Sequence, residues 1–118
     1  MKNKEILSQL ESIAAHQDFD SMVMIRHFGS GVVWQLYRLE RIQGHGEKIS
    51  NILGTLMGPR SSRPALTLRD IRSKLDVLVP VCKPDVVVFL TPGGEYMYAE
   101  CMGIELDSSN RVVIEVSE

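Results

Sequence analysis

The sequence is poor in the residues and patterns that mark secreted, metal-binding and membrane proteins. Its 118 residues include two cysteines, Cys82 and Cys101, whose spacing matches neither a CxxC redox motif nor a paired metal-binding knuckle. No segment approaches the roughly 18 apolar residues that a membrane helix needs. Polar residues interrupt the apolar positions near the N-terminus, so a signal peptide is not indicated. We therefore expect a cytoplasmic protein that does not associate with membranes.

Motifs for catalysis and cofactor binding are missing as well. The three histidines are widely separated and form no HExxH pair. Ser30, in the stretch FGSGV, does not stand in the G-x-S-x-G elbow of a hydrolase. Asp18 and Asp20 have the D-x-D spacing of a phosphotransfer loop, but they follow a predicted helix instead of a buried strand, so we interpret them as part of a turn. The sequence predicts no catalytic residue, no metal site and no cofactor.

The overall composition is that of a soluble globular protein. Apolar residues make up 44% of the chain and charged residues 24%. A chain of 118 residues is long enough to bury one hydrophobic core. We expect residues 1–118 to form a single compact domain.

The N-terminal third predicts a helix followed by a hairpin. Apolar residues at intervals of three and four indicate a helix over residues 4–16, with Asn3 as its N-cap. Two segments rich in β-branched and aromatic residues flank the sequence GSG, which indicates a β-hairpin over residues 21–42. In the register that we expect, Arg26 lies opposite Trp34 and can rest on its ring.

The middle of the chain predicts two further helices. A second apolar stripe at helical spacing indicates a helix over residues 47–57, and the following Gly58 is a normal stop signal. A third helix is predicted over residues 68–78, where Thr67 and Asp70 have the spacing of a capping box.

The C-terminal third predicts an antiparallel meander of three strands over residues 85–116, separated by the turn sequences PGG and DSSN. We expect Thr91 opposite Glu95 and Glu105 opposite Arg111, which leaves both faces of the meander apolar. One face is expected to receive a helix. The other must be covered by the N-terminal elements or by a second copy of the chain, and it comprises Val87, Phe89, Met97, Ala99 and Cys101.

Together these elements predict an α+β fold in the order α-β-β-α-α-β-β-β. We expect a mainly antiparallel sheet with the helices packed on one face. The register of the meander places Cys82 roughly 10 Å from the position opposite Cys101, so no disulfide is expected.

Charge is divided along the chain. Residues 26–83 hold ten lysines and arginines against four acidic residues, whereas residues 84–118 hold one arginine against seven acidic residues. The loop over residues 58–66 lacks the G-K-[ST] sequence of a nucleotide-binding loop and follows a predicted helix. Its basic side chains and those of the next helix are candidate contacts for an anion or a nucleic acid: Arg60, Arg63, Arg69, Arg72 and Lys74.

From these features we expect a small non-enzymatic accessory or regulatory protein that acts through protein–protein contact, with a homodimer as one form of that contact. One alternative is a nucleic-acid-associated protein that binds phosphates through residues 60–74. Another is an enzyme whose site is assembled only by folding. The candidate interface residues are apolar or aromatic: Val87, Phe89, Met97, Trp34 and Tyr37.

Overall fold

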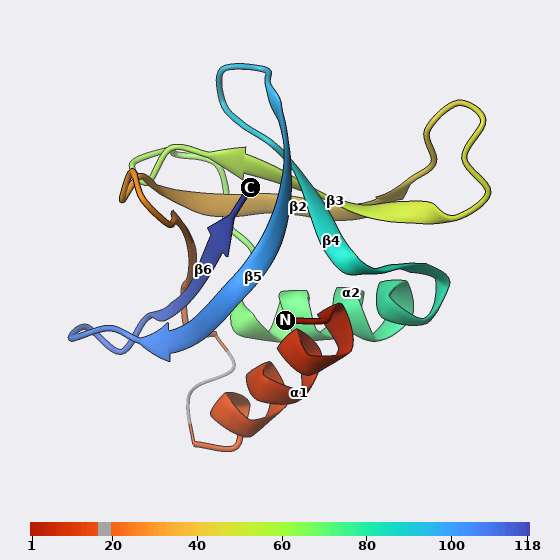
Figure 1. The fold of residues 1–118 in the computed structure, drawn as a ribbon. Coiled ribbons are helices and arrows are strands. Elements are labelled where there is room, and N and C mark those ends of the chain that lie inside the picture. Colours follow the sequence, from red (N-terminus) through yellow and green to blue (C-terminus); the bar gives the residue numbers. More distant parts are fainter. Residues whose placement is uncertain (17–19) are drawn as a thin grey trace.

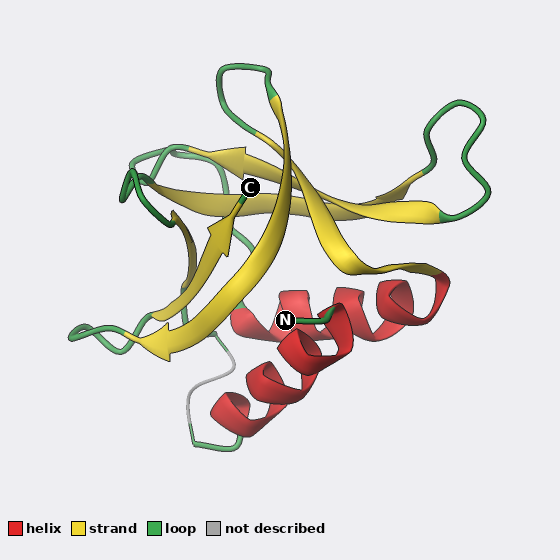
Figure 2. Ribbon diagram, in the orientation of Figure 1, coloured by secondary structure: helices red, strands yellow, loops and turns green. Residues whose placement is uncertain are grey.

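The computed structural model describes residues 1–16 and 20–118, which form a closed barrel of six strands with α1 and α2 side by side at one end (Figures 1 and 2). Asp18 lies outside the described residues. The strands follow one another around the barrel in chain order. The elements are α1 (Asn3–Ala14), β1 (Val23–His27), β2 (Val33–Ile42), β3 (Ser50–Met57), α2 (Leu68–Leu78), the 3-10 turn η1 (Val79–Val81), β4 (Cys82–Leu90), β5 (Tyr96–Leu106) and β6 (Val112–Ser117).

The same order, one helix followed by three strands, occurs twice along the chain. Antiparallel pairs join the strands within each half, whereas the parallel pairs β3–β4 and β1–β6 join the two halves and close the barrel. The predicted mainly antiparallel sheet with helices on one face, in the order α-β-β-α-α-β-β-β, is therefore wrong. The prediction missed one strand, and it missed the parallel pairs because they join residues far apart in sequence.

The predicted helix over residues 47–57 is the missed strand, β3, in which every residue except Thr55 is buried. A strand that is buried on both faces has a nearly continuous apolar sequence, and its spacing matches a helical stripe equally well. The packing around Gly54 fits the strand. A Cβ atom on Gly54 would lie 2.8 Å from the Phe89 ring and 3.0 Å from Leu36, so the strand needs a glycine at this close approach.

The prediction of α2 is confirmed in its bounds and in its cap. The Asp70 backbone N–H donates to Thr67 Oγ1 at 3.3 Å, and the Thr67 backbone N–H donates to Asp70 Oδ2 at 3.1 Å. These two bonds satisfy backbone donors that a helix N-terminus otherwise leaves unpaired. The capping box therefore fixes where the second half of the chain begins.

The first helix forms near its predicted bounds, but Asn3 does not cap it. Lys2 is the N-cap, and Asn3 is a buried residue of the first turn. The Asn3 side-chain amide donates to the carbonyl oxygens of Lys83 and Val86 at 2.9 and 3.1 Å. Asn3 thus ties α1 to β4, in the other half of the chain.

The predicted hairpin of β1 and β2 forms with a register shifted by one residue. Arg26 lies opposite Val33 and not opposite Trp34. Its guanidinium donates to Glu105 at 2.6 Å and to Glu115 at 2.8 Å, so it joins β1 to β5 and β6 and does not rest on the indole ring.

In the meander, the predicted register of β4 with β5 is confirmed, since the Thr91 N–H donates to the Glu95 carbonyl at 2.8 Å. Between β5 and β6 the pairing differs by two residues, and Glu105 lies opposite Val113. A bulge between Cys101 and Gly103 exchanges the inner and outer faces along β5. The face without a predicted helix is the barrel interior, covered within the chain, and includes Val87, Phe89, Met97, Ala99 and Cys101.

The hydrophobic core fills the barrel and continues into α1 and α2. Leu10 of α1 and Leu68 of α2 have no exposed surface, and Ile71 is 1% exposed. Within the described residues, no helix is long and apolar enough to cross a membrane. The helices therefore serve to close one end of the barrel.

Both cysteines are buried as free thiols, which confirms the expectation that they form no disulfide. Burial raises the pKa of the Cys82 and Cys101 thiols above the ordinary value. A raised pKa leaves the thiols protonated and unreactive at neutral pH. They act as small apolar side chains of the core.

Candidate functional site

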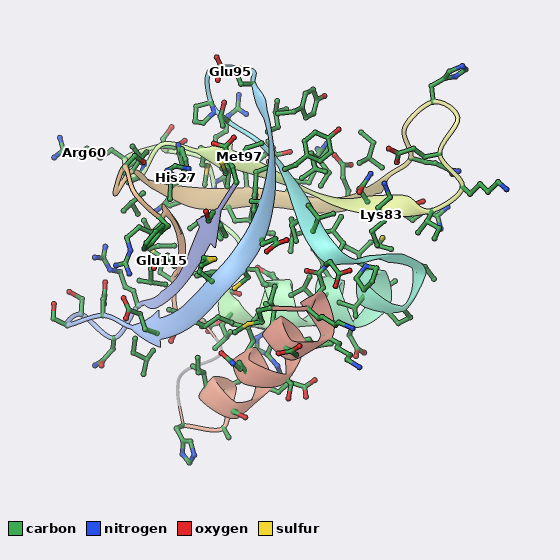
Figure 3. The ribbon with its side chains drawn as sticks, in the orientation of Figure 1. His27, Arg60, Lys83, Glu95, Met97 and Glu115 are labelled. Atoms are coloured by element: carbon green, nitrogen blue, oxygen red, sulfur yellow. The ribbon has the colours of Figure 1, made fainter. Side chains whose placement is uncertain are left out.

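The end of the barrel away from the helices carries a polar hollow. Two loops lie there, one between His27 and Val33 and one between Leu90 and Tyr96. Figure 3 shows Glu95 at the second loop, with His27 and Met97 toward the barrel. The hairpin-end hollow has a volume of about 230 Å³ and is lined by His27, Ser30, Val32, Trp34, Thr91, Glu95, Tyr96, Met97 and Glu118.

The sequence of each loop explains why these side chains are held in place. Gly29 and Gly31 have φ angles of 96° and 72°, a conformation that other residues rarely adopt. In the second loop Gly94 has a φ of 85°, and the Glu95 N–H donates to the Thr91 hydroxyl at 3.2 Å. Both turns are therefore defined by their glycines and by local hydrogen bonds.

His27 connects the first loop to the end of the chain. Its Nδ1 lies 2.7 Å from Ser30 Oγ, and its Nε2 lies 3.4 Å from a Glu118 carboxylate oxygen. The Ser30 hydroxyl also accepts a hydrogen bond from the Val32 N–H at 3.3 Å. The imidazole packs edge-on against Trp34, with ring centroids 6.4 Å apart. This network orients the side chains on one wall of the hollow.

A hydroxyl, an imidazole and a carboxylate in series are also the groups of a serine hydrolase. Such a site further needs hydrogen-bond donors that hold an oxyanion, from backbone N–H groups or from side chains. Here the N–H groups of Phe28 and Gly31 donate to the carbonyls of Val116 and His27 at 2.8 and 2.9 Å, and the Val32 N–H donates to Ser30. With these donors engaged, we interpret the series as the support of the β1–β2 turn.

The walls of the hollow combine negative charge with exposed aromatic surface. Glu95 and Glu118 supply two exposed carboxylates, and none of the lining residues in the described part of the chain is lysine or arginine. Tyr96 is 59% exposed and Val32 is 46% exposed, while Trp34 is half-buried. Such a surface suits a ligand that has both an apolar portion and a positive charge.

Four of the five predicted basic contacts are exposed, namely Arg60, Arg63, Arg69 and Lys74, and two of these four also contact neighbouring side chains. Arg63 lies over the Tyr37 ring, 5.3 Å from its centroid. Arg69 lies 3.6 Å from the Asp20 carboxylate, and Arg72 is half-buried. Figure 3 shows Arg60 pointing away from the barrel.

The basic loop has an ordered path over the barrel wall. The Ser61 N–H donates to the Gly58 carbonyl at 3.1 Å, and the Arg63 N–H donates to the Ser61 hydroxyl at 3.2 Å. At the end of the loop the Leu66 N–H donates to a β2 carbonyl at 2.8 Å. The loop between β3 and α2 is therefore a fixed crossover between the two halves of the chain.

The predicted interface residues separate into two groups. Val87, Phe89 and Met97 lie in the barrel interior and are 9%, 4% and 5% exposed, and Met97 also lines the hairpin-end hollow. Tyr37 is half-buried beneath Arg63, and Trp34 lines the hairpin-end hollow. The aromatic signal in the sequence therefore identified one residue of the hollow.

Sequence analysis missed the polar residues of the hollow, because they come together only when the barrel closes. Ser30 and Glu95 belong to different hairpins, and Glu118 follows β6. One signal was available: each hairpin loop has a glycine next to a polar residue, in the stretches GSG and GGE. Among the described residues there is no group of three or more histidine, cysteine or acidic residues that could hold a metal.

No family model, curated protein or solved structure matches this chain. The function therefore has to be argued from the hairpin-end hollow itself.

Proposed function

We propose that the protein is a non-enzymatic binding protein that contacts a protein partner through the hairpin end of its barrel. The observation that carries this proposal is the exposure of large apolar side chains around a polar hollow. Phe28, Val32 and Tyr96 are 56%, 46% and 59% exposed on the two loops and the adjoining strand. Soluble proteins rarely gather such residues without a contact to cover them, and aromatic side chains beside a hollow are typical of recognition sites.

The size of the hollow favours a partner side chain over a cofactor. Pockets for small molecules and cofactors usually enclose roughly 300–1,000 Å³, whereas this hollow measures about 230 Å³. Residues of both hairpin loops line it, so a partner that fills it also contacts the loops. This arrangement matches an interface in which one anchoring residue enters a depression and the loops form the rim.

Site-specific photo-cross-linking tests this proposal. A photoreactive phenylalanine analogue replaces Val32 or Tyr96 at the hairpin end, and Val77 on α2 serves as the control position because it is 69% exposed at the helix end. We expect one protein species to be cross-linked at both hairpin positions and not at Val77. A product that contains only this chain would identify a homodimer. Equal products at all three positions, or none at the hairpin end, would contradict the proposal.

The nucleic-acid alternative has weaker support. Phosphate binding relies on several cationic side chains that can reach the backbone together. Four of the basic side chains are exposed, but two of them, Arg63 and Arg69, also contact Tyr37 and Asp20. A fluorescence-anisotropy titration with duplex DNA at about 50 and 200 mM salt decides the question. Binding that falls on the order of a thousandfold between these conditions, and that weakens in Arg60→Ala with Arg63→Ala, would favour this alternative.

A further inference from the structure

We propose that the hairpin-end hollow recognises an arginine side chain of the partner protein. This inference rests on the proposed function, and it names the chemistry of the residue that enters the hollow.

Charge complementarity indicates a cation. Glu95 and Glu118 are exposed carboxylates that line the hollow, one on the β4–β5 loop and one after β6. Beside Glu118 the structure records the His27 imidazole, whose Nε2 lies 3.4 Å from a carboxylate oxygen. Glu95 makes no side-chain ion pair among the described residues at 4.0 Å or less. At least one carboxylate of the hollow is therefore available to an incoming cation.

The kinds of acceptor favour arginine over lysine. A guanidinium has five N–H donors in one plane, whereas a lysine ammonium is a compact charge. Besides the two carboxylates, the lining includes the hydroxyl oxygens of Ser30 and Thr91. Several acceptors spread around a hollow suit a planar group with several donors.

The aromatic surface points to the same ligand. Tyr96 is 59% exposed beside the hollow, and Trp34 is half-buried in its wall. A guanidinium stacks on aromatic rings and is less strongly hydrated than an ammonium. The protein already uses this contact once, since Arg63 lies 5.3 Å from the Tyr37 ring centroid on the outer wall of the barrel.

An NMR titration of the ¹⁵N-labelled protein tests the inference with three small ligands: the N-acetylated amides of arginine, of lysine and of citrulline. Citrulline has the shape of arginine without the charge. We expect arginine amide to shift the backbone signals of the two hairpin loops, and citrulline amide to bind about fivefold more weakly or worse. Equal binding of citrulline or lysine amide, or no shift with arginine amide, would overturn the inference.

Variants assign the effect to the carboxylates. The double substitution Glu95→Gln and Glu118→Gln should weaken arginine-amide binding about fivefold or more. The control is Glu100→Gln, which removes an exposed carboxylate of β5 that does not line the hollow, and it should leave binding unchanged. Unchanged binding in the double variant would contradict the role of the carboxylates. Cross-linking at Val32 and Tyr96 does not depend on arginine, so the proposed function can survive the failure of this inference.

Discussion

The two ends of the barrel are built from the same strands but in opposite ways. At the helix end, where α1 and α2 lie side by side (Figure 1), both helices insert fully buried leucines into the core. At the hairpin end, two short loops surround a hollow with carboxylates and exposed aromatic surface. Because the helices supply the apolar cover that the fold needs, the hairpin end is free to carry polar and exposed residues. We infer that stability is concentrated at one end of the molecule and recognition at the other.

Truncation of a buried leucine at the helix end should have the largest effect on stability. Leu10 has no exposed surface, so Leu10→Ala should lower the free energy of unfolding by about 2–5 kcal/mol through lost burial and a residual cavity. Urea unfolding measures this change. Leu7→Ala, on the half-buried side of the same helix, is the control and should cost less. Equal losses in the two variants would show that α1 does not seal the barrel as described.

The second largest loss of stability is expected for a substitution in the barrel wall between the two ends. Gly54→Ala places a methyl group 2.8 Å from the Phe89 ring, and such overpacking costs about 1–3 kcal/mol. Thermal or urea unfolding measures the loss. Gly103→Ala is the matched control, since a Cβ atom there meets no atom within 4 Å and its φ is not positive. A second substitution, Phe89→Leu, should recover part of the loss in Gly54→Ala; no recovery would argue against a direct clash.

The sequence predicted the elements that depend on local signals. The capping box of Thr67 and Asp70 fixed α2, and the turn residues between Thr91 and Glu95 fixed the register of β4 with β5. It failed at β3, because a strand buried on both faces and an amphipathic helix place apolar residues at compatible positions. The sequence also did not predict that the barrel closes. The β1–β6 and β3–β4 pairs that close it are parallel, so no turn sequence marks them.

The hollow could not be predicted because it too depends on pairing between distant parts of the chain. Trp34 attracted attention as an aromatic residue on a predicted strand, but its neighbours Glu95 and Glu118 come from distant parts of the chain. Residues on different hairpins become neighbours only through barrel closure. A site that depends on long-range pairing leaves no spacing pattern in the sequence.

At the hairpin end, removal of an aromatic side chain should change binding and not stability. Tyr96→Ala should weaken arginine-amide binding about two- to fivefold, the range expected for an exposed cation–π contact. Its free energy of unfolding should stay within about 0.5 kcal/mol of the parent protein, because Tyr96 is 59% exposed. NMR titration and urea unfolding give the two values. Val77→Ala, at the exposed surface of α2, is the control. An equal loss of arginine-amide binding in Val77→Ala would contradict the assignment of binding to the hairpin end.

The smallest effect on stability is expected at the helix end, in the β5–β6 turn, where Asp107 accepts hydrogen bonds from the loop. The Arg111 and Ser109 N–H groups both donate to one of its carboxylate oxygens at 2.9 Å, and the Arg111 guanidinium donates to the other at 2.7 Å. The Arg111 backbone N–H, followed by the guanidinium and Ser109, holds the pKa of Asp107 below its ordinary value. A lowered pKa in the folded state stabilises the protein above the unfolded-state value of about 3.9, and this contribution is lost as the pH falls through the folded pKa. Asp107→Asn should therefore melt slightly below the parent protein at pH 7, and the difference should shrink in thermal scans below about pH 4. A difference that persists or grows in acid would mean that the carboxylate charge does not hold this turn.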